Sequence, residues 1–275
     1  MNGIPVSYSI VIPVLNQLQY TRQCVESLSK GGVPPSALFI INNGSTDGTA
    51  GWLDQRADIP HISNPVNLGC GCAWTQGAIL RHSSDWVIIF NNDVIAPPGF
   101  ADALIEAGKR FGLEVVSPAL LEGPLDYDFA GFARSMTGLL SNTLRRGWVH
   151  GVCFAVKREV FQRIGFFDTD RRLGGHEDKE FFVRCDQAGI PVGTTGAAVL
   201  HHFGSITQKA LKLELGIKKL GDHRFAYRRM GMTWFDRKRY KRRQRLQKEF
   251  WVREEFSKYQ VTMHMERENS QWIYR

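Results

Sequence analysis

The segment Asp85-Trp-Val-Ile-Ile-Phe-Asn-Asn-Asp93 joins an apolar run to side chains that bind metals. Residues 86–90 are β-branched and aromatic, which is typical of a strand buried on both faces. Asn91, Asn92 and Asp93 then offer amide and carboxylate oxygens, which hard divalent cations take together with substrate phosphates. In an open α/β sheet, ligands bind beyond the carboxyl ends of the strands. The alternative is a polar turn, since Asn and Asp are also common turn residues.

A second polar cluster, Asn42-Asn-Gly-Ser-Thr-Asp-Gly48, follows the apolar residues 37–41. Its glycines permit close approach of the backbone to a ligand, and its polar side chains can hydrogen-bond a nucleoside. The same loop can instead cap the next helix through Ser45 or Asp47. The two roles are compatible, so both stay open.

A glycine-rich turn, Asn67-Leu-Gly-Cys-Gly-Cys-Ala73, precedes a predicted helix. Gly69-x-Gly71 resembles the start of a dinucleotide-binding fingerprint, but Trp74 occupies the third glycine position and no strong strand comes before it. The pattern therefore argues against a Rossmann dehydrogenase. A turn at a helix N-terminus can still face a phosphate group.

Two adjacent carboxylates, Glu177 and Asp178, open a predicted helix within Gly174-Gly-His-Glu-Asp-Lys-Glu180. Carboxylates in a first turn usually balance the helix dipole. The functional alternative is that one of them acts as a general base. Further along, His201-His202 follows a predicted last strand and offers a nitrogen ligand for a metal, although such a pair is more often structural.

Alternating strands and helices must position these clusters. Repeated strand–helix units predict an α/β fold with a mostly parallel central sheet and helices on both faces. The predicted strands are residues 8–14, 37–41, 86–90, 148–156 and 197–200, and the predicted helices are residues 18–28, 49–56, 73–82, 97–111, 157–164 and 177–188.

Two parts of the chain depart from this alternation. Residues 118–146 are less regular and predict a loop and a short hairpin over the site. Residues 206–222 and 236–260 have helical spacing with no strand signal around them. We therefore predict a catalytic domain over residues 1–204 and a helical extension over residues 205–275.

Composition narrows the class of protein. The chain has 275 residues, of which 43% are hydrophobic, enough for a substantial core. It has no apolar run of 18 residues, so no transmembrane helix is expected, and Met1-Asn-Gly-Ile-Pro5 lacks the features of a signal peptide. The five cysteines show no zinc spacing. We expect reduced thiols in a cytoplasmic protein.

The net charge of +8 is unevenly distributed. Residues 205–275 carry a net +11 and residues 1–204 a net −3, so the basic excess lies in the extension. Its densest run, Asp236-Arg-Lys-Arg-Tyr-Lys-Arg-Arg-Gln-Arg245, is interleaved with aromatic residues. This composition favours a helix on an anionic membrane surface. Packing against the catalytic domain or a second subunit comes close behind, and contact with a nucleic-acid backbone is third. The oligomeric state stays open.

The order and spacing of these motifs resemble glycosyltransferase family 2, and most closely its rhamnosyltransferase-like branch. The resemblance covers roughly residues 7–205. The matching motifs are Ser9-Ile-Val-Ile-Pro-Val-Leu-Asn16, Ile41-Asn-Asn-Gly-Ser-Thr-Asp-Gly-Thr49, Asn67-Leu-Gly69, Phe90-Asn-Asn-Asp93, Gly151-Val-Cys-Phe-Ala-Val-Lys-Arg158, Gly165-Phe-Phe-Asp168, His176-Glu-Asp178 and His201-His-Phe-Gly-Ser205.

The resemblance implies a GT-A nucleotide-sugar fold and assigns roles to residues. Asp93 matches the last position of the family's metal motif, and His201, with His202 next, matches a histidine that coordinates Mn²⁺ or Mg²⁺ in some members. Because only one carboxylate remains in the motif, a metal-independent enzyme is the alternative. The implied nucleotide-sugar-binding residues are Pro13, Asn16, Asn42, Asn43, Ser45, Asp47, Asn67, Gly69, Asn91 and Asn92.

The resemblance also implies an inverting transfer of a sugar from a nucleotide-diphosphate sugar, with Asp178 as the base and Glu177 beside it. The expected acceptor is a saccharide or a lipid-linked saccharide of a bacterial surface polysaccharide, such as an O-antigen or capsule, reached from the inner face of the membrane. One alternative keeps the fold and glycosylates a modified base in nucleic acid. Another is a non-catalytic protein that binds sugar nucleotides or nucleic acid, for which Asn42 and Asn91, in place of carboxylates, are the support.

Overall fold

The first strand, β1 (Tyr8–Val14), is an apolar segment whose side chains alternate between the two faces of a central sheet. In this computed structural model, which describes residues 7–275, Ile10 and Ile12 pack on one face and Val11 on the other. The segment Met1-Asn-Gly-Ile-Pro5, on which the prediction about a signal peptide rests, lies outside the described residues.

Strands and helices alternate through most of the chain. The further strands are β2 (Leu38–Asn43), β3 (His61–Asn64), β4 (Trp86–Phe90), β5 (Val94–Ile95), β6 (Val115–Glu122), β7 (Leu144–Arg146), β8 (Cys153–Lys157), β9 (Val192–His202), β10 (His264–Glu268) and β11 (Gln271–Tyr274). The α-helices are α1 (Leu18–Lys30), α2 (Thr49–Asp54), α3 (Cys70–Leu80), α4 (Phe100–Arg110), α5 (Phe129–Leu140), α6 (Arg158–Ile164), α7 (Glu177–Gln187), α8 (Ile206–Glu214), α9 (His223–Arg229) and α10 (Trp234–Tyr259), and short 3₁₀ helices span Pro35–Ala37 and Arg171–Leu173.

All of these strands join one sheet in the order β11-β10-β6-β8-β4-β1-β2-β3, with β9 paired to β5, β6 and β7. The half formed by β3, β2, β1 and β4 is parallel, as predicted. Strand β8 runs antiparallel to both β4 and β6, so the sheet as a whole is mixed. The predicted α/β fold with a helix-flanked central sheet is confirmed.

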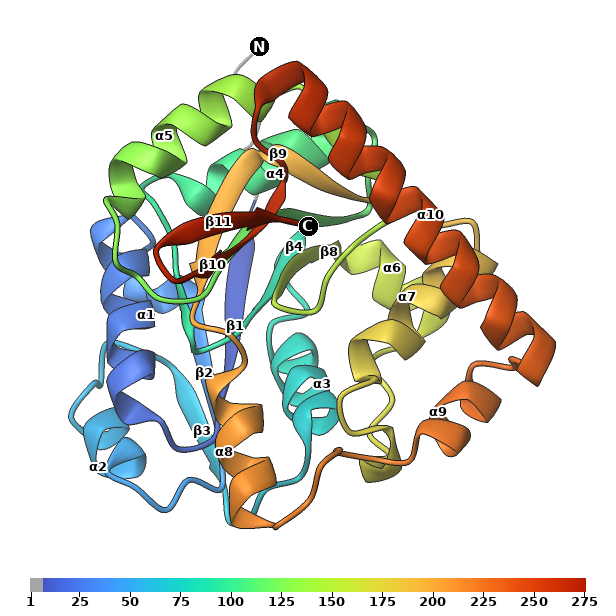
Figure 1. The fold of residues 1–275 in the computed structure, drawn as a ribbon. Coiled ribbons are helices and arrows are strands. Elements are labelled where there is room, and N and C mark those ends of the chain that lie inside the picture. Colours follow the sequence, from blue (N-terminus) through green and yellow to red (C-terminus); the bar gives the residue numbers. More distant parts are fainter. Residues whose placement is uncertain (1–6) are drawn as a thin grey trace.

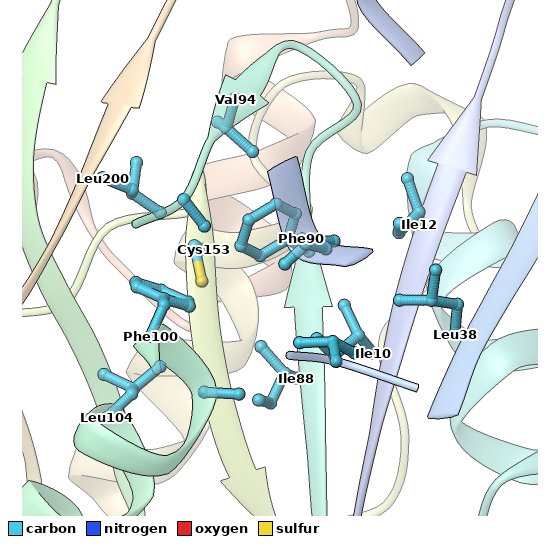
Figure 2. Close-up of a cluster of buried hydrophobic side chains, with 14 of the residues drawn as sticks. Ile10, Ile12, Leu38, Ile88, Phe90, Val94, Phe100, Leu104, Cys153 and Leu200 are labelled. Atoms are coloured by element: carbon cyan, nitrogen blue, oxygen red, sulfur yellow. The ribbon is translucent and has the colours of Figure 1, made fainter. Parts of the chain in front are cut away.

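Helices cover both faces of the sheet (Figure 1). Helices α1 and α4 pack on one face, while α3, α6 and α7 pack on the other. Figure 2 shows the first of these cores, where Ile10, Ile88 and Phe90 from the strands meet Phe100 and Leu104 from α4. Burial on both faces explains why β1, β2 and β4 are almost continuous apolar runs, which is the feature that made them recognisable in the sequence.

The prediction for residues 118–146 is wrong, because strand β6 and helix α5 occupy most of this region instead of a loop and a hairpin. Pro118 obscured the strand, since proline is rare inside sheets except at bulges. The pairing of β6 with β9 shifts register between Pro118 and Ala119, which accommodates the proline. His150 Nε2 donates to the Pro118 carbonyl over 2.8 Å, so that carbonyl is satisfied from outside the ladder.

The prediction of a strand-free extension is also wrong. Strand β10 adds to the sheet beside β6 in parallel, and β11 pairs with β10 in an antiparallel hairpin. The segment His264-Met-Glu-Arg-Glu268 is mostly polar, so it has low intrinsic strand propensity. Its pairing with β6 and the burial of Met265 make it a strand. Strand β3 and helix α9 were likewise not predicted.

Helix α10 runs along one side of the molecule and is anchored near its C-terminal end (Figure 1). Arg145 Nε donates to Glu255 Oε1 over 2.7 Å, and both side chains are almost completely buried. The indole rings of Trp148 and Trp251 meet edge to face, with centroids 5.8 Å apart. Packing of residues 205–275 on the preceding part of the chain, one of the alternatives for this region, is therefore observed. Among residues 7–275, no helix combines the length and apolar character needed to cross a bilayer.

Candidate active site

A cleft of about 660 Å³ lies at the carboxyl ends of β1, β2 and β4. These strands are parallel neighbours, with Val14 paired to Asn42 and Val11 to Ile89, so the segments that follow them reach the same edge of the sheet. Nine of the residues predicted from sequence line this cleft: Pro13, Asn43, Asn67, Gly69, Asn91, Asn92, Asp93, Glu177 and Asp178.

Asn43 ties the loop after β2 to the turn before α3. Its Nδ2 donates to Asn67 Oδ1 over 3.1 Å and to the Gly69 carbonyl over 3.2 Å. The next residue, Gly44, has φ 81°, and a Cβ there would lie 2.4 Å from the carbonyl carbon of Val66. Only glycine fits this close crossing of two backbones. The two loops therefore form one wall of the cleft.

Four of the predicted residues do not line the cleft: Asn16, Asn42, Ser45 and Asp47. Their hydrogen bonds instead stabilise the loops that form its wall. Asn16 N–H donates to Ser45 Oγ over 2.8 Å, and Asn42 Oδ1 accepts from Ser45 N–H over 3.1 Å. Asp47 Oδ1 accepts from Thr49 N–H over 3.0 Å at the start of α2. A direct contact of these four residues with a nucleotide stays a prediction.

Asp93 is buried and connects the end of β4 to helix α8. Its Oδ2 accepts from Ile206 N–H over 2.9 Å, and its backbone carbonyl accepts from Phe203 N–H. Asn92 Nδ2 donates to Thr21 Oγ1 over 3.0 Å, which fixes the neighbouring residue. Although burial alone would raise it, the pKa of Asp93 is held below its usual value by His202 and by the Ile206 N–H. The carboxylate is therefore an anion at neutral pH.

His202, rather than His201, lies beside Asp93. Its Nε2 is 3.4 Å from Asp93 Oδ1, and its Nδ1 is 2.7 Å from Glu122 Oε1. Burial opposes the charged form, but these two carboxylates raise the pKa of His202 to about 9. His201 Nδ1 instead bonds the Tyr127 hydroxyl over 2.9 Å, and burial lowers its pKa to about 4.

The sequence favoured His201 as the metal-binding histidine, and the structure places His202 next to Asp93 instead. Both residues belong to β9, whereas the prediction placed them after the end of the last strand. Successive side chains of a strand point to opposite faces, so only one of the pair can face Asp93.

Glu177 and Asp178 form the first turn of α7 and contact nearby backbone groups. Asp178 Oδ1 accepts from Lys179 N–H over 2.7 Å, and Glu177 Oε2 accepts from His176 N–H over 2.9 Å. Burial raises the pKa of Asp178 to about 6, with a further contribution from the Glu177 carboxylate, while the Lys179 N–H opposes the rise. A carboxylate with such a pKa can accept a proton near neutral pH.

Gly151 makes room for this carboxylate. A Cβ at position 151 would lie 2.2 Å from Asp178 Oδ2, so a larger residue would displace the side chain.

One wall of the cleft was missed by sequence reasoning because it comes from the extension. Thr207, Gln208 and Leu211 of α8 line it, and Ile217 and Leu220 continue it beyond the helix. These residues carry no motif, and only the apolar spacing of a helix indicated their region.

Arg171, a charged residue that lines the cleft, was missed as well. The predicted boundary near residue 205 thus divides residues that line the same cleft.

Residues 9–165 match the model of the family described as glycosyl transferase family 2. The chain belongs to this family. It is similar to the N-acetylglucosaminyl-diphospho-decaprenol L-rhamnosyltransferase of Mycobacterium tuberculosis, with 29% identity over 66% of this chain and 72% of the relative. It is also similar to the O-antigen biosynthesis protein RfbC of Myxococcus xanthus, with 25% identity over 76% of this chain but only 18% of that protein.

The fold of this family 2 glycosyltransferase is similar to that of GalNAc-T7, solved with UDP, GalNAc and Mn²⁺. The TM-score is 0.57 at 14% identity, covering 74% of this chain and 44% of the GalNAc-T7 chain. This chain therefore spans less than half of that structure. The similarity supports the GT-A-like architecture, and its low identity carries no residue roles.

In this glycosyltransferase, Asp93 and His202 are the side chains that would hold a divalent cation, and His202 would first release its Nε2 proton, because a histidine binds a metal only through a deprotonated nitrogen. Within residues 7–275, no group of three or more His, Cys, Asp or Glu side chains is placed to hold a metal ion. A cation bound by two side chains would need diphosphate and water oxygens to complete its ligands. Glu122, at His202 Nδ1, occupies the position of a carboxylate that orients a metal-binding histidine. The donor set thus suits Mn²⁺ or Mg²⁺ bound largely through substrate.

Proposed function

We propose that this glycosyltransferase transfers a sugar, with inversion, from a nucleoside diphosphate sugar to an acceptor hydroxyl. The observation that carries the proposal is that Asp93 and Asp178 line one cleft, each on a different wall. Asp93 follows a sheet strand, where phosphates bind in open α/β folds. Asp178 opens α7 and has the pKa of a general base.

In the proposed step, a lone pair of the acceptor oxygen forms a bond to the anomeric carbon as the bond from that carbon to the diphosphate breaks. Asp178 accepts the proton of the acceptor hydroxyl. Arg171 also lines the cleft, and we assign its positive charge to offset that of the departing nucleoside diphosphate. The loops joined by Asn43 hold the donor, and most of the acceleration comes from alignment of the two substrates.

Asp93 and His202 would hold Mn²⁺ or Mg²⁺ at the diphosphate. The cation would act there as a Lewis acid that offsets charge on the leaving group. GalNAc-T7, whose fold is similar, was solved with UDP and Mn²⁺ together. The alternative of a metal-independent enzyme is decided by the experiment below.

The acceptor we favour is a saccharide or lipid-linked saccharide of a bacterial surface polysaccharide. The names of the mycobacterial rhamnosyltransferase and of the O-antigen protein support this setting. A surface on α10 also supports it: Phe235, Arg239, Arg242, Leu246 and Phe250 are exposed and recur at spacings of three or four residues, which places them on one helix face. We call this surface the outer face of α10.

A basic and aromatic face of this kind suits the interface of an anionic membrane. We therefore place the enzyme in the cytoplasm, peripherally at the inner face of the membrane.

A thermal-shift screen with UDP, dTDP, GDP and CMP, each with and without Mn²⁺, tests the donor side of the proposal. One nucleotide should raise the melting temperature, and Mn²⁺ should increase that shift in the native protein but not in Asp93→Ala. Turnover of the corresponding nucleotide sugar is the second readout.

Stabilisation without a metal effect would remove the cation from the mechanism. No response to any nucleotide, together with no turnover, would contradict the proposal and direct the test to nucleic acid.

A further inference from the structure

A second cavity, of about 360 Å³, lies between α7, α10 and the loop around Trp148. Its size is within the range of cavities that bind small molecules. Asp178 lines both this cavity and the cleft described above, so one carboxylate residue is common to the two. The sequence motifs assigned no role to this space, and the family match ends at residue 165, before α7 and α10 begin.

The chemistry of the second cavity suits a neutral polyhydroxylated ligand. Trp148 and Tyr240 contribute aromatic rings, and Gln187 and Gln244 contribute amides. A sugar ring matches this combination, because its C–H faces are apolar and its hydroxyls donate to and accept from amides and carboxylates.

The charges around the second cavity are mixed in sign. Lys179 and Arg243 are the cations that line it, and Asp178, Asp186 and Asp236 are the anions. A lining with both signs offers no positive field for an isolated phosphate or diphosphate. The ligand we consider is therefore the sugar part of a substrate rather than a phosphate group.

Contacts between α7, α9 and α10 hold the walls in place. Lys179 Nζ donates to the Tyr227 hydroxyl over 2.9 Å and lies 4.6 Å from the ring centroids of both Tyr227 and Tyr240. At the other end, the buried pair of Arg145 and Glu255 fixes α10 to the catalytic domain. A cavity built by such contacts is largely formed before a ligand arrives, which lowers the cost of binding.

The geometry points to the second cavity as the acceptor site, where a saccharide binds with its reacting hydroxyl at Asp178. This inference rests on the proposed function. The donor then occupies the cleft and the acceptor reaches the anomeric carbon from the α10 side, with the base where the two meet. The acceptor oxygen forms the new glycosidic bond, its proton goes to Asp178, and the bond to the nucleoside diphosphate breaks. The extension thereby selects the acceptor.

Protection from alkylation tests binding without requiring turnover. In the full chain, Gln244→Cys places a thiol in the cavity, and Leu246→Cys places one on the outer face of the same helix. Each variant is treated with iodoacetamide alone or with methyl β-glucoside, methyl β-N-acetylglucosaminide or methyl α-rhamnoside, and the modified peptides are quantified by mass spectrometry.

At least one glycoside should slow alkylation of Gln244→Cys and leave Leu246→Cys unchanged. Equal rates at both positions with every glycoside would overturn the inference. Failure of the proposed function would be recognised separately, as absence of donor turnover by the native protein.

Kinetics with the protecting glycoside as acceptor give an independent test. Tyr240→Ala should raise the acceptor KM about tenfold, as expected for loss of an aromatic anchor. It should leave the hydrolysis of donor by water, measured without acceptor, unchanged. Phe250→Ala, an aromatic truncation on the outer face of α10, should change neither quantity. An unchanged acceptor KM in Tyr240→Ala, or an equal loss of donor hydrolysis, would overturn the inference.

Discussion

The two sides of the cleft are built in different ways. The side that follows β1, β2 and β4 consists of short loops whose side chains bond one another, as Asn43 does with Asn67. The opposite side comes from α7 and the extension, and it is held by contacts between distant segments, as Ile206 N–H at the start of α8 donates to Asp93 Oδ2. The first side carries recognisable motifs because local loop geometry restricts the residues that fit. The second side depends on packing, which permits many sequences, and it is the side we expect to differ between enzymes of one fold.

The largest expected effect is on chemistry at the junction of the two sides. Asp178→Asn removes the base and keeps the shape of the side chain, so we expect kcat to fall about 10²–10⁴-fold. The nucleotide-induced shift in melting temperature should remain. Asp102→Asn, which neutralises an exposed carboxylate on α4, is the matched control and should retain full activity. Near-native turnover by Asp178→Asn would contradict the assignment of the base.

Among these variants, the one that weakens the attachment of residues 205–275 should lower the free energy of unfolding most. Arg145→Met leaves Glu255 as a buried, unpaired charge, so the free energy of unfolding should fall by about 3–5 kcal/mol. Denaturant unfolding measures this change. Arg245→Met breaks an exposed pair with Glu249 on the same helix and should cost no more than about 0.5 kcal/mol.

The double variant Arg145→Met with Glu255→Met should recover much of the lost stability, because no unpaired charge remains. Equal losses in Arg145→Met and Arg245→Met would mean that the extension is not held by the buried pair.

A small change next to the base should reduce activity without unfolding the protein. Gly151→Ala places a methyl group against Asp178 Oδ2, and a displacement of the base of about 1 Å can cost about 10²-fold in rate. Gly138→Ala, whose Cβ would meet nothing within 4 Å, controls for the effect of alanine itself. Steady-state kinetics and melting temperatures of both variants make the comparison. Full activity of Gly151→Ala would show that Asp178 can move freely.

The pH dependence should report the base directly. Burial raises the pKa of Asp178 to about 6, and the base works only when deprotonated. The value of kcat/KM should therefore fall about tenfold for each pH unit below about 6 and level off above it. Titration of kcat/KM against pH in the native protein measures this. A plateau that continues well below about pH 6 would indicate a less buried carboxylate in the working enzyme.

The smallest expected effect concerns the outer face of α10. Replacing Arg239 and Arg242 with Glu should weaken binding to phosphatidylglycerol vesicles at least about tenfold, since each basic residue near such a surface contributes about 1 kcal/mol. Sedimentation with vesicles measures this, and phosphatidylcholine vesicles give the uncharged reference. The same charge changes at Lys109 and Arg110 of α4 are the control. Equal weakening by both pairs would indicate that net charge, rather than this face, governs binding.

The side of the cleft that follows β1, β2 and β4 could be predicted from the sequence because strand ends and loop residues are locally encoded. The apolar runs of β1, β2 and β4 located the strands, and the ends of parallel strands meet at one edge. Asn43 and Asp93 therefore came together as expected. Asn16 and Ser45 did not reach the cleft, because their polar groups bond each other. The type of a polar residue does not show whether it contacts a ligand or another residue of its own loop.

The histidines and the extension could not be predicted in the same way. Whether His201 or His202 meets Asp93 depends on the register of β9 against β5, and a shift of one residue would exchange them. Strand β10 is polar and forms because β6 offers it an unpaired edge. Such outcomes are decided by partners far away in the chain, which local propensity does not record.

Motifs and apolar periodicity are properties of neighbouring residues, so the family, the parallel half of the sheet and the wall of the cleft that carries Asp93 follow from the order of the residues along the chain. Three features depend on the folded chain: His202 faces Asp93, α8 lines the cleft, and α10 lines a second cavity beside Asp178. Each of these depends on contacts between segments tens to hundreds of residues apart, such as the pair of Arg145 and Glu255. In these regions a side chain reaches its place in the site only when distant segments of the chain have packed against each other.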